Sequence, residues 1–262
     1  MIGSTDMATV EPAHADDSGR GWFVYGVVEA GVAVPEGLMG LDQEPVVTQA
    51  RGRVAALVSP VVIDRPPGRG ADLLAYNGVL DAVTQRGVAV VPVRFGSVLP
   101  DEQSIVEEFL GPDESYFAEL LASLGGRAQF VIHGLYDEQA VLSEIVAGDP
   151  EIAELRAQTR DVPEEESFGA RVRLGELVAG AVEARREVDT TGVLDQVLPL
   201  AEAYVERPVS GVERVFDVAL LVADTRRDEL DVRLERLAEE VHPRMRLRLL
   251  GPTAPFDFSG GG

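Results

Sequence analysis

The pattern of apolar and polar positions predicts its elements most clearly between Gly87 and Leu110. Val88–Val91 is an apolar run of the length expected for a short buried strand. Pro92 then ends regular pairing, because proline has no backbone N–H to donate. Gly96 is a residue that readily adopts positive φ, and Pro100 opens a helix. The stretch therefore predicts a strand, a turn and a helix, and the rest of the chain is organised around it.

Three strands and one helix are expected before this stretch. The helix places Leu73, Tyr76, Leu80 and Val83 on one face, with the spacing of an amphipathic helix. With a closing strand at Val88–Val93, the order is strand, connection, strand, strand, helix, strand. This order is close to a ferredoxin-like unit whose first crossover helix is reduced or replaced. The earlier elements are expected at Trp22–Ala30, Pro45–Gln49, Val54–Val58 and Ala71–Arg86.

Helical periodicity dominates the middle of the chain. Residues 101–124 predict two short acidic helices broken at Gly111-Pro112. A strand is expected at Arg127–Tyr136, and an acidic loop at Asp161–Ser167 separates two groups of helices. The helices of these groups are expected at Asp137–Ala147, Pro150–Gln158, Phe168–Val188 and Leu194–Tyr204.

The last part of the chain predicts a strand at Val212–Ala223, a helix at Arg226–Val241 and a strand at Arg244–Leu250. From Arg127 onward we read the order as strand, helices, strand, strand, helix, strand. This repeats the first half with a long helical insertion, although no sequence identity between the halves is visible. We therefore expect an α+β fold of two domains. The expected divisions are a disordered leader (1–21), an N-terminal modified ferredoxin-like domain with trailing helices (22–125), a C-terminal α+β domain, ferredoxin-like with a helical insertion (126–258), and a flexible tail (259–262).

Charge limits the classes of partner. The 262 residues include 45 acidic and 23 basic side chains, all 23 of them arginine, which gives a net charge of −22. Such a field repels phosphate backbones and anionic lipids, so we expect neither nucleic acid nor membrane as a partner. Residues 100–170 hold 17 of the acidic residues and three arginines. This concentration fits either a solvated helical face or a surface that meets a basic partner.

Cysteine is absent, and the N-terminal residues are polar and acidic without an apolar run. No disulfide framework, signal peptide or spanning helix is expected, which together suggest a soluble cytoplasmic protein.

Candidate catalytic groups are sparse. His14, His133 and His242 lie far apart and lack the spacing of metal ligands, so we expect no metal and no cofactor. The turn after Val91 has neither a nucleophile nor a phosphate-binding glycine loop. We therefore expect no enzyme. Arg244, Arg246 and Arg248 share one face of a strand, where pairing with acidic helices is favoured over a binding role.

Four segments together resemble one family. Val90–Val98, VVPVRFGSV, resembles the LP-x-RFG-T-V signature of the gas vesicle protein GvpL/GvpF family. Trp22–Val28 resembles the family's opening strand with its Tyr-Gly pair. Gly126–His133 occupies the place of its G-K-V-E-W strand. Gly251–Phe258, GPTAPFDF, is similar to its closing G-P-W-P-P-Y-x-F, and the four segments together span about residues 22–258.

The chain also departs from the family pattern. Thr253 and Ala254 replace the Trp and Pro of the closing motif, and Phe256 replaces its Tyr. Gln129 and Phe130 stand where Glu and Trp are common. If the family residues only pack, these substitutions preserve the fold. If they contact a specific partner, that contact is changed in this chain.

The resemblance implies a non-enzymatic accessory or minor structural protein of gas vesicle formation. It would bind the small hydrophobic shell protein of the GvpA type during assembly, as a chaperone-like adaptor, with other accessory proteins as further partners. Its location would be the gas vesicle in the cytoplasm. The alternative is a small-molecule-binding regulatory module or a cryptic enzyme on a ferredoxin-like scaffold, which a deep polar pocket between the domains would favour.

The resemblance also selects site residues. We expect Arg94 to anchor its turn by hydrogen bonds, Phe95 to pack between the halves, and Gly96 to meet a backbone requirement. We expect the closing segment to dock its aromatic side chains on the body of the protein. The residues of that segment that carry the signature are Gly251, Pro252, Pro255, Phe256 and Phe258.

Overall fold

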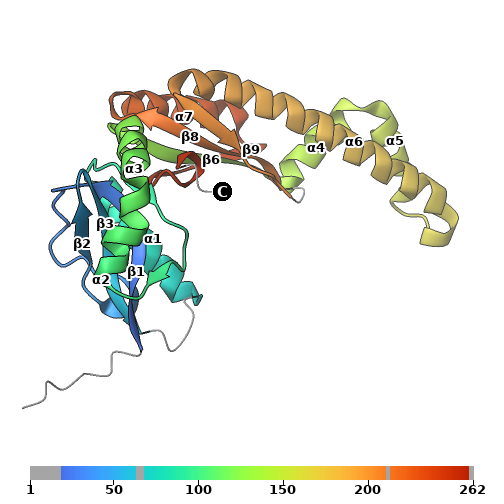
Figure 1. Cartoon of the computed structure of the whole chain (residues 1–262). Coiled ribbons are helices and arrows are strands. Elements are labelled where there is room, and N and C mark those ends of the chain that lie inside the picture. Colours follow the sequence, from blue (N-terminus) through green and yellow to red (C-terminus); the bar gives the residue numbers. More distant parts are fainter. Residues whose placement is uncertain (1–18, 63–67, 211–212, 260–262) are drawn as a thin grey trace, which may run out of the picture.

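The computed structural model describes residues 19–62, 68–210 and 213–259. These residues form two antiparallel sheets with helices packed on them, which confirms the expected α+β class (Figure 1). Most of the predicted leader (1–18) and most of the predicted tail (260–262) lie outside the described residues.

The first sheet has the strand order β2-β3-β1-β4, and β5 pairs with the same strand, β1. The central strand β1 is buried along almost its whole length, because the sheet is covered on both faces. Its strands are β1 (Arg20–Glu29), β2 (Val47–Arg51), β3 (Val54–Val62), β4 (Val91–Pro92) and β5 (Val98–Leu99).

Helices cover both faces of this sheet. On one face, α1 (Gly70–Thr84) packs on Phe23 and Tyr25. On the other face, Val24 and Val27 contact a helix that comprises α2 (Glu102–Ser104), a π-helical turn and α3 (Gly111–Leu124). Alternate residues of one strand therefore enter two separate cores.

Two expectations for this half were wrong. The acidic helix does not break at Gly111-Pro112, because the π-helical turn at Ile105–Leu110 interrupts the α ladder first. Pro112 then occupies the first turn of α3, where its missing N–H is not needed. The predicted strand Val88–Val93 is also reduced to two residues, since Val88 and Ala89 line a hollow instead of pairing with β1.

The second sheet repeats the strand order of the first, as β7-β8-β6-β9. If the strands of each sheet are numbered one to four along the chain, the order across the sheet is two, three, one, four in both. The two sheets therefore share one strand order, although the sequence had predicted a helix where β7 begins. The strands are β6 (Arg127–Tyr136), β7 (Ala203–Glu206), β8 (Arg214–Ala223) and β9 (Met245–Thr253).

One face of the second sheet packs on two helices. These are the C-terminal part of α6 (Glu164–Val197) and α7 (Arg227–Val241). Two sequence predictions about α6 were wrong. Glu164–Glu166 form its first turn instead of a loop, which suits the positive end of the helix dipole. The helix also ends at Val197, where a 3-10 turn at Leu198–Leu200 follows, and Tyr204 lies in β7.

The N-terminal half of α6 extends away from the sheet as an arm, together with α4 (Glu138–Gly148) and α5 (Pro150–Thr159) (Figure 1). A buried carboxylate fixes the base of this arm. Asp189 on α6 accepts hydrogen bonds from the Tyr136 hydroxyl (2.9 Å), from two nitrogens of Arg244 (3.0 Å each) and from Arg185 Nε (3.2 Å). The network joins α6 to β6 and β9.

Candidate functional site at the junction of the two sheets

The Arg-Phe-Gly turn leaves β4 and returns along β1. The Val93 N–H donates to the Tyr25 carbonyl (3.0 Å), and the Arg94 carbonyl accepts from the Ser97 N–H (3.2 Å) and hydroxyl (2.8 Å). Gly96 has φ +91°, in the region that favours glycine. The main chain of Arg94 therefore holds the turn, whereas its exposed guanidinium has no hydrogen-bond or ion-pair partner within the described ranges.

Aromatic rings connect this turn to the C-terminal end of the chain. The ring of Tyr76 on α1 lies 5.3 Å from that of Phe95 and 6.1 Å from that of Phe256, measured between centroids. The Tyr76 hydroxyl donates to the Val93 carbonyl (2.5 Å). Burial raises the pKa of Tyr76 to about 12, so the phenol keeps its proton and this bond at neutral pH. Phe95 also packs on Phe23 of β1 (5.8 Å).

The closing segment, Gly251–Phe258, lies directly on β6. Gly251 has φ +138°, and a Cβ there would lie 2.8 Å from Phe130 Cδ1 and 2.9 Å from the Gln129 carbonyl oxygen. No side chain fits in this space. Ala254 is fully buried in the core between the first sheet and α1, so the segment joins the two sheets.

Polar contacts hold the end of this segment. The Asp257 N–H donates to the Gln129 side-chain oxygen (3.0 Å), and Gln129 itself is buried. The Asp257 carboxylate receives two hydrogen bonds from Arg207, one of them at 3.1 Å from Nε. This bidentate geometry is the strong form of an arginine–carboxylate pair. Phe258 packs near Leu221, and Pro255 is buried.

A hollow of about 410 Å³ lies where these parts meet. It brings together Arg94, Phe95 and Phe256 from segments that are 160 residues apart in the sequence, whereas Gly251, Pro252 and Phe258 support the structure around it. Leu73 lines the hollow with 47% of its surface exposed, contrary to its predicted place on the packed face of α1. Its full lining is Leu73, Tyr76, Asn77, Pro92, Val93, Arg94, Phe95, Arg207, Phe256 and Ser259.

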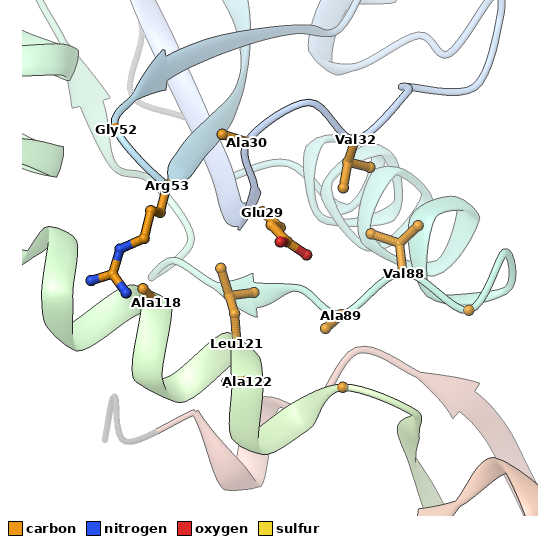
Figure 2. Close-up of a pocket in the computed structure, with 12 residues that line it drawn as sticks. Glu29, Ala30, Val32, Gly52, Arg53, Val88, Ala89, Ala118, Leu121 and Ala122 are labelled. Atoms are coloured by element: carbon orange, nitrogen blue, oxygen red, sulfur yellow. The ribbon is translucent and has the colours of Figure 1, made fainter.

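A second hollow, of about 730 Å³, lies at the far end of the first sheet (Figure 2). Its walls are mostly small apolar residues from β1, the β2–β3 turn, residues 87–89 and α3. Glu29 points into it among Val32, Ala89 and Leu121, as Figure 2 shows. Arg53 on its rim donates its N–H to Glu114 (3.1 Å). Sequence reasoning missed this hollow, because four separate segments form it and none has a motif.

Within residues 19–62, 68–210 and 213–259, no group of three His, Cys, Asp or Glu side chains could hold a metal ion. In the same ranges, no helix has both the length and the apolar character needed to cross a bilayer. His133 pairs instead with Asp217, at 3.4 Å between Nε2 and Oδ2.

The fold and its signature segments define a class of gas vesicle protein. The family described as Gas vesicle synthesis protein GvpL/GvpF matches residues 21–260. The chain therefore belongs to the GvpL/GvpF family, as the motifs predicted.

Relatives agree over nearly the full length. Gas vesicle protein F of Streptomyces sp. (strain CB03234) is 32% identical over 242 residues, which cover 90% of this chain and 98% of that protein. Gas vesicle protein F of Microcystis aeruginosa (strain PCC 7806) is 25% identical over 91% of this chain and 98% of its own length. Gas vesicle protein L of Haloferax mediterranei is 20% identical over 71% of this chain and 61% of its own length.

Two solved structures share the fold. The crystal structure of GvpF from Anabaena sp. PCC7120 has a TM-score of 0.79 at 22% identity, over 92% of this chain and 99% of that one. GvpF from Microcystis aeruginosa has a TM-score of 0.72 at 23% identity, with the same coverage.

Proposed function

We propose that this member of the family is a non-enzymatic accessory protein that binds the hydrophobic gas vesicle shell protein during assembly, with the junction hollow as its binding surface. One observation supports this most directly. Leu73 and Phe256 are exposed by 47% and 37% in a hollow that is also lined by the signature residues Arg94 and Phe95. Adjoining exposed apolar side chains of this kind mark interaction surfaces.

The chemistry of the hollow suits an apolar protein segment. Its aromatic and aliphatic walls offer surface that a hydrophobic subunit would otherwise leave in water. The guanidinium of Arg94, which has no partner among the described residues, offers hydrogen-bond donors to main-chain carbonyls at the end of such a segment. A deep polar pocket between the sheets would favour the alternative, a small-molecule regulator or cryptic enzyme. Six of the ten residues that line this hollow are aliphatic or aromatic, which favours the adaptor over the alternative.

Three further points belong to this proposal. We infer that the protein acts at the gas vesicle in the cytoplasm and meets other accessory proteins there, a role in keeping with the names of its relatives. We also propose two structural domains, residues 22–125 and 126–258, each of ferredoxin-like type. The shared strand order of the two sheets supports that description.

A co-expression pull-down tests the proposal. Tagged chain is expressed with the shell protein, and captured and soluble shell protein are measured. We expect the wild type to capture the shell protein and the Leu73→Glu/Phe256→Ser variant to lose most of that capture. Val232→Glu, which changes a similarly exposed apolar residue on α7, is the matched control and should capture normally.

The result separates the two hollows. Loss of capture by Ala118→Glu, with the junction variant unaffected, would move the binding surface to the hollow in Figure 2. Failure of the wild type to associate with the shell protein would refute the adaptor role itself.

A further inference from the structure

The face of the second sheet opposite α6 and α7, which we call the open face, is covered at one end, where Leu221 packs with α3 and Phe258. On β6, Phe130 and Ile132 point into the core with α6 and α7, so Val131, His133 and Leu135 point to the opposite face. This open face is distinct from the junction hollow, although Arg207 borders both.

Strand register places four arginines on that face in two adjacent rows. In one row, His133 lies opposite Arg248 on β9 and opposite Asp217 on β8. In the next row, Leu135 lies opposite Arg246 and Arg214. Side chains of directly opposed residues share a face of the sheet. Arg207 extends the first row, because its N–H donates to the Asp217 carbonyl (2.8 Å).

We call Arg207, Arg214, Arg246 and Arg248 the arginine face. Two carboxylates, Asp217 and Asp257, lie among its guanidinium groups, and Asp257 receives both hydrogen bonds of a bidentate pair with Arg207. Asp217 is 8% exposed and pairs with Arg214 (3.3 Å) and more loosely with Arg207 (3.6 Å). Arg246 and Arg248 are exposed and have no ion-pair partner in the part of the chain that the structure describes. The face therefore has excess positive charge in a protein of net charge −22.

The sequence predicted otherwise for these residues. The stripe Arg244, Arg246, Arg248 was expected to pair with acidic helices. Only Arg244 does so, with Asp189 on α6 and Glu144 on α4. Arg246 and Arg248 point to the open face, and no acidic side chain of the described residues pairs with them.

Protection of a sheet edge explains only part of this arrangement. Natural proteins place charged side chains on edge strands to prevent pairing with other chains, and β9 is an edge strand. Arg214, however, comes from the interior strand β8, and Arg207 follows the opposite edge strand β7. Four arginines across the full width of a sheet form a patch, not a guarded edge.

We propose that the arginine face binds an acidic amphipathic helix of a partner protein. Guanidinium groups bind carboxylates in a bidentate manner. Leu135 and Leu250 lie half-buried on the same face and would contact the helix's aliphatic side chains. Strands lie about 4.8 Å apart, so the patch is about 14 Å wide, which matches one helix. A nucleic acid backbone offers no aliphatic groups, and the net charge of the protein opposes it.

A direct binding assay tests this assignment. The probe is a fluorescent synthetic helix that alternates glutamate and leucine with helical periodicity, titrated with the full chain at low and high salt. We expect saturable, salt-sensitive binding by the wild type. Arg246→Glu/Arg248→Glu should weaken binding at least about tenfold, since each charge-assisted hydrogen bond contributes about that factor.

The controls separate the site from general charge. Arg156→Glu/Arg160→Glu, on α5 and at the residue that follows it, makes the same change in net charge at exposed positions of the arm and should bind like the wild type. Arg246→Lys/Arg248→Lys keeps the charge but loses the bidentate geometry. Its affinity for the probe should lie between those of the wild type and of Arg246→Glu/Arg248→Glu. Melting temperatures establish that each variant is folded.

Several outcomes would overturn the proposal. These are equal loss of binding in the α5 control, no loss in the β9 variant, or equal binding of a single-stranded oligonucleotide. A dimer that dissociates in the β9 variant would assign the face to a second copy of this chain. None of these results depends on the shell protein, so this inference and the proposed function can fail separately.

Discussion

Substitution of Gly251 by alanine probes the contact between the closing segment and the second sheet. The residue has φ +138°, and its missing Cβ would lie within 3 Å of two atoms of β6, the Gln129 carbonyl oxygen and Phe130 Cδ1. Neither atom can move freely, because β6 is bonded on both sides, to β8 and β9, and the Phe130 ring is buried in the core.

Two effects set the expected loss of stability, the positive φ at residue 251 and the steric overlap of the new Cβ with β6. An L-residue at such a φ costs on the order of 1–3 kcal/mol, and the overlap with β6 adds to it. We expect a total loss of about 3 kcal/mol in the free energy of unfolding. At 2–4 °C per kcal/mol, this corresponds to a melting temperature lower by roughly 6–12 °C. If undocking of the closing segment costs less free energy than this strain, the segment undocks, and Ala254 and Asp257 lose their contacts with the rest of the protein.

Urea denaturation and thermal melting measure the change, and exchange of the backbone amide hydrogens of residues 253, 254 and 256–258 detects undocking. Gly175→Ala is the matched control. Gly175 lies inside α6 with nothing near its missing Cβ, so alanine should stabilise the helix by up to about 1 kcal/mol. Substitution of glycine by alanine is thus expected to lower the free energy of unfolding at position 251 and to raise it at position 175.

Unchanged stability and unchanged exchange in Gly251→Ala would refute this reasoning. It would mean that the closing segment does not pack on β6 in solution.

Three other predictions follow from contacts described above. Asp189→Ala should destabilise the chain by about 3 kcal/mol in urea denaturation, because Arg244 loses its partner in a buried network; a loss below about 1 kcal/mol would contradict this. Arg94→Ala should leave the melting temperature unchanged while weakening capture of the shell protein, whereas a lower melting temperature would assign the guanidinium a structural role. Burial lowers the pKa of His133 below its ordinary 6.5, so its contribution to stability is complete above that pH and is lost as pH falls toward the folded-state pKa. Melting temperatures between about pH 5 and 7.5 should fall less steeply for His133→Gln, and parallel curves would argue against the shift. The charged groups facing His133 are Asp217, which opposes the effect of burial, and Arg207, Arg214 and Arg248, which add to it.

Local patterns predicted most elements of the fold. The runs of β-branched residues in β1, β3 and β8 and the stripe Leu230, Leu234, Leu237 of α7 give clear periods of two and 3.6, so these elements lie where the sequence placed them. Pro199 does not force the preceding residue out of the helical region, because Leu198 keeps helical dihedral angles, and the end of α6 could therefore not be placed from this proline alone.

Other features depend on contacts that no local pattern contains. Pro112 looks like a helix breaker in isolation, but the π-helical turn before it makes a continuous helix possible. Leu73 has helical spacing with Tyr76, yet it borders a hollow that exists only because Phe256 returns from the end of the chain. Arg246 and Arg248 alternate as expected for a strand, but their separation from Arg244 depends on where α6 crosses the sheet.

The arm formed by α4, α5 and the N-terminal half of α6 affects how the molecule moves through solution. At about 1.5 Å per residue, the 34 residues of α6 are about 50 Å long, and much of that length lies beyond the sheet (Figure 1). A 28.1 kDa chain of this outline has more frictional drag than a sphere of equal mass. A monomer should therefore elute early from a sizing column, at the volume of a larger globular protein. Light scattering or sedimentation equilibrium, which report mass independently of shape, is needed to distinguish an elongated monomer from a dimer.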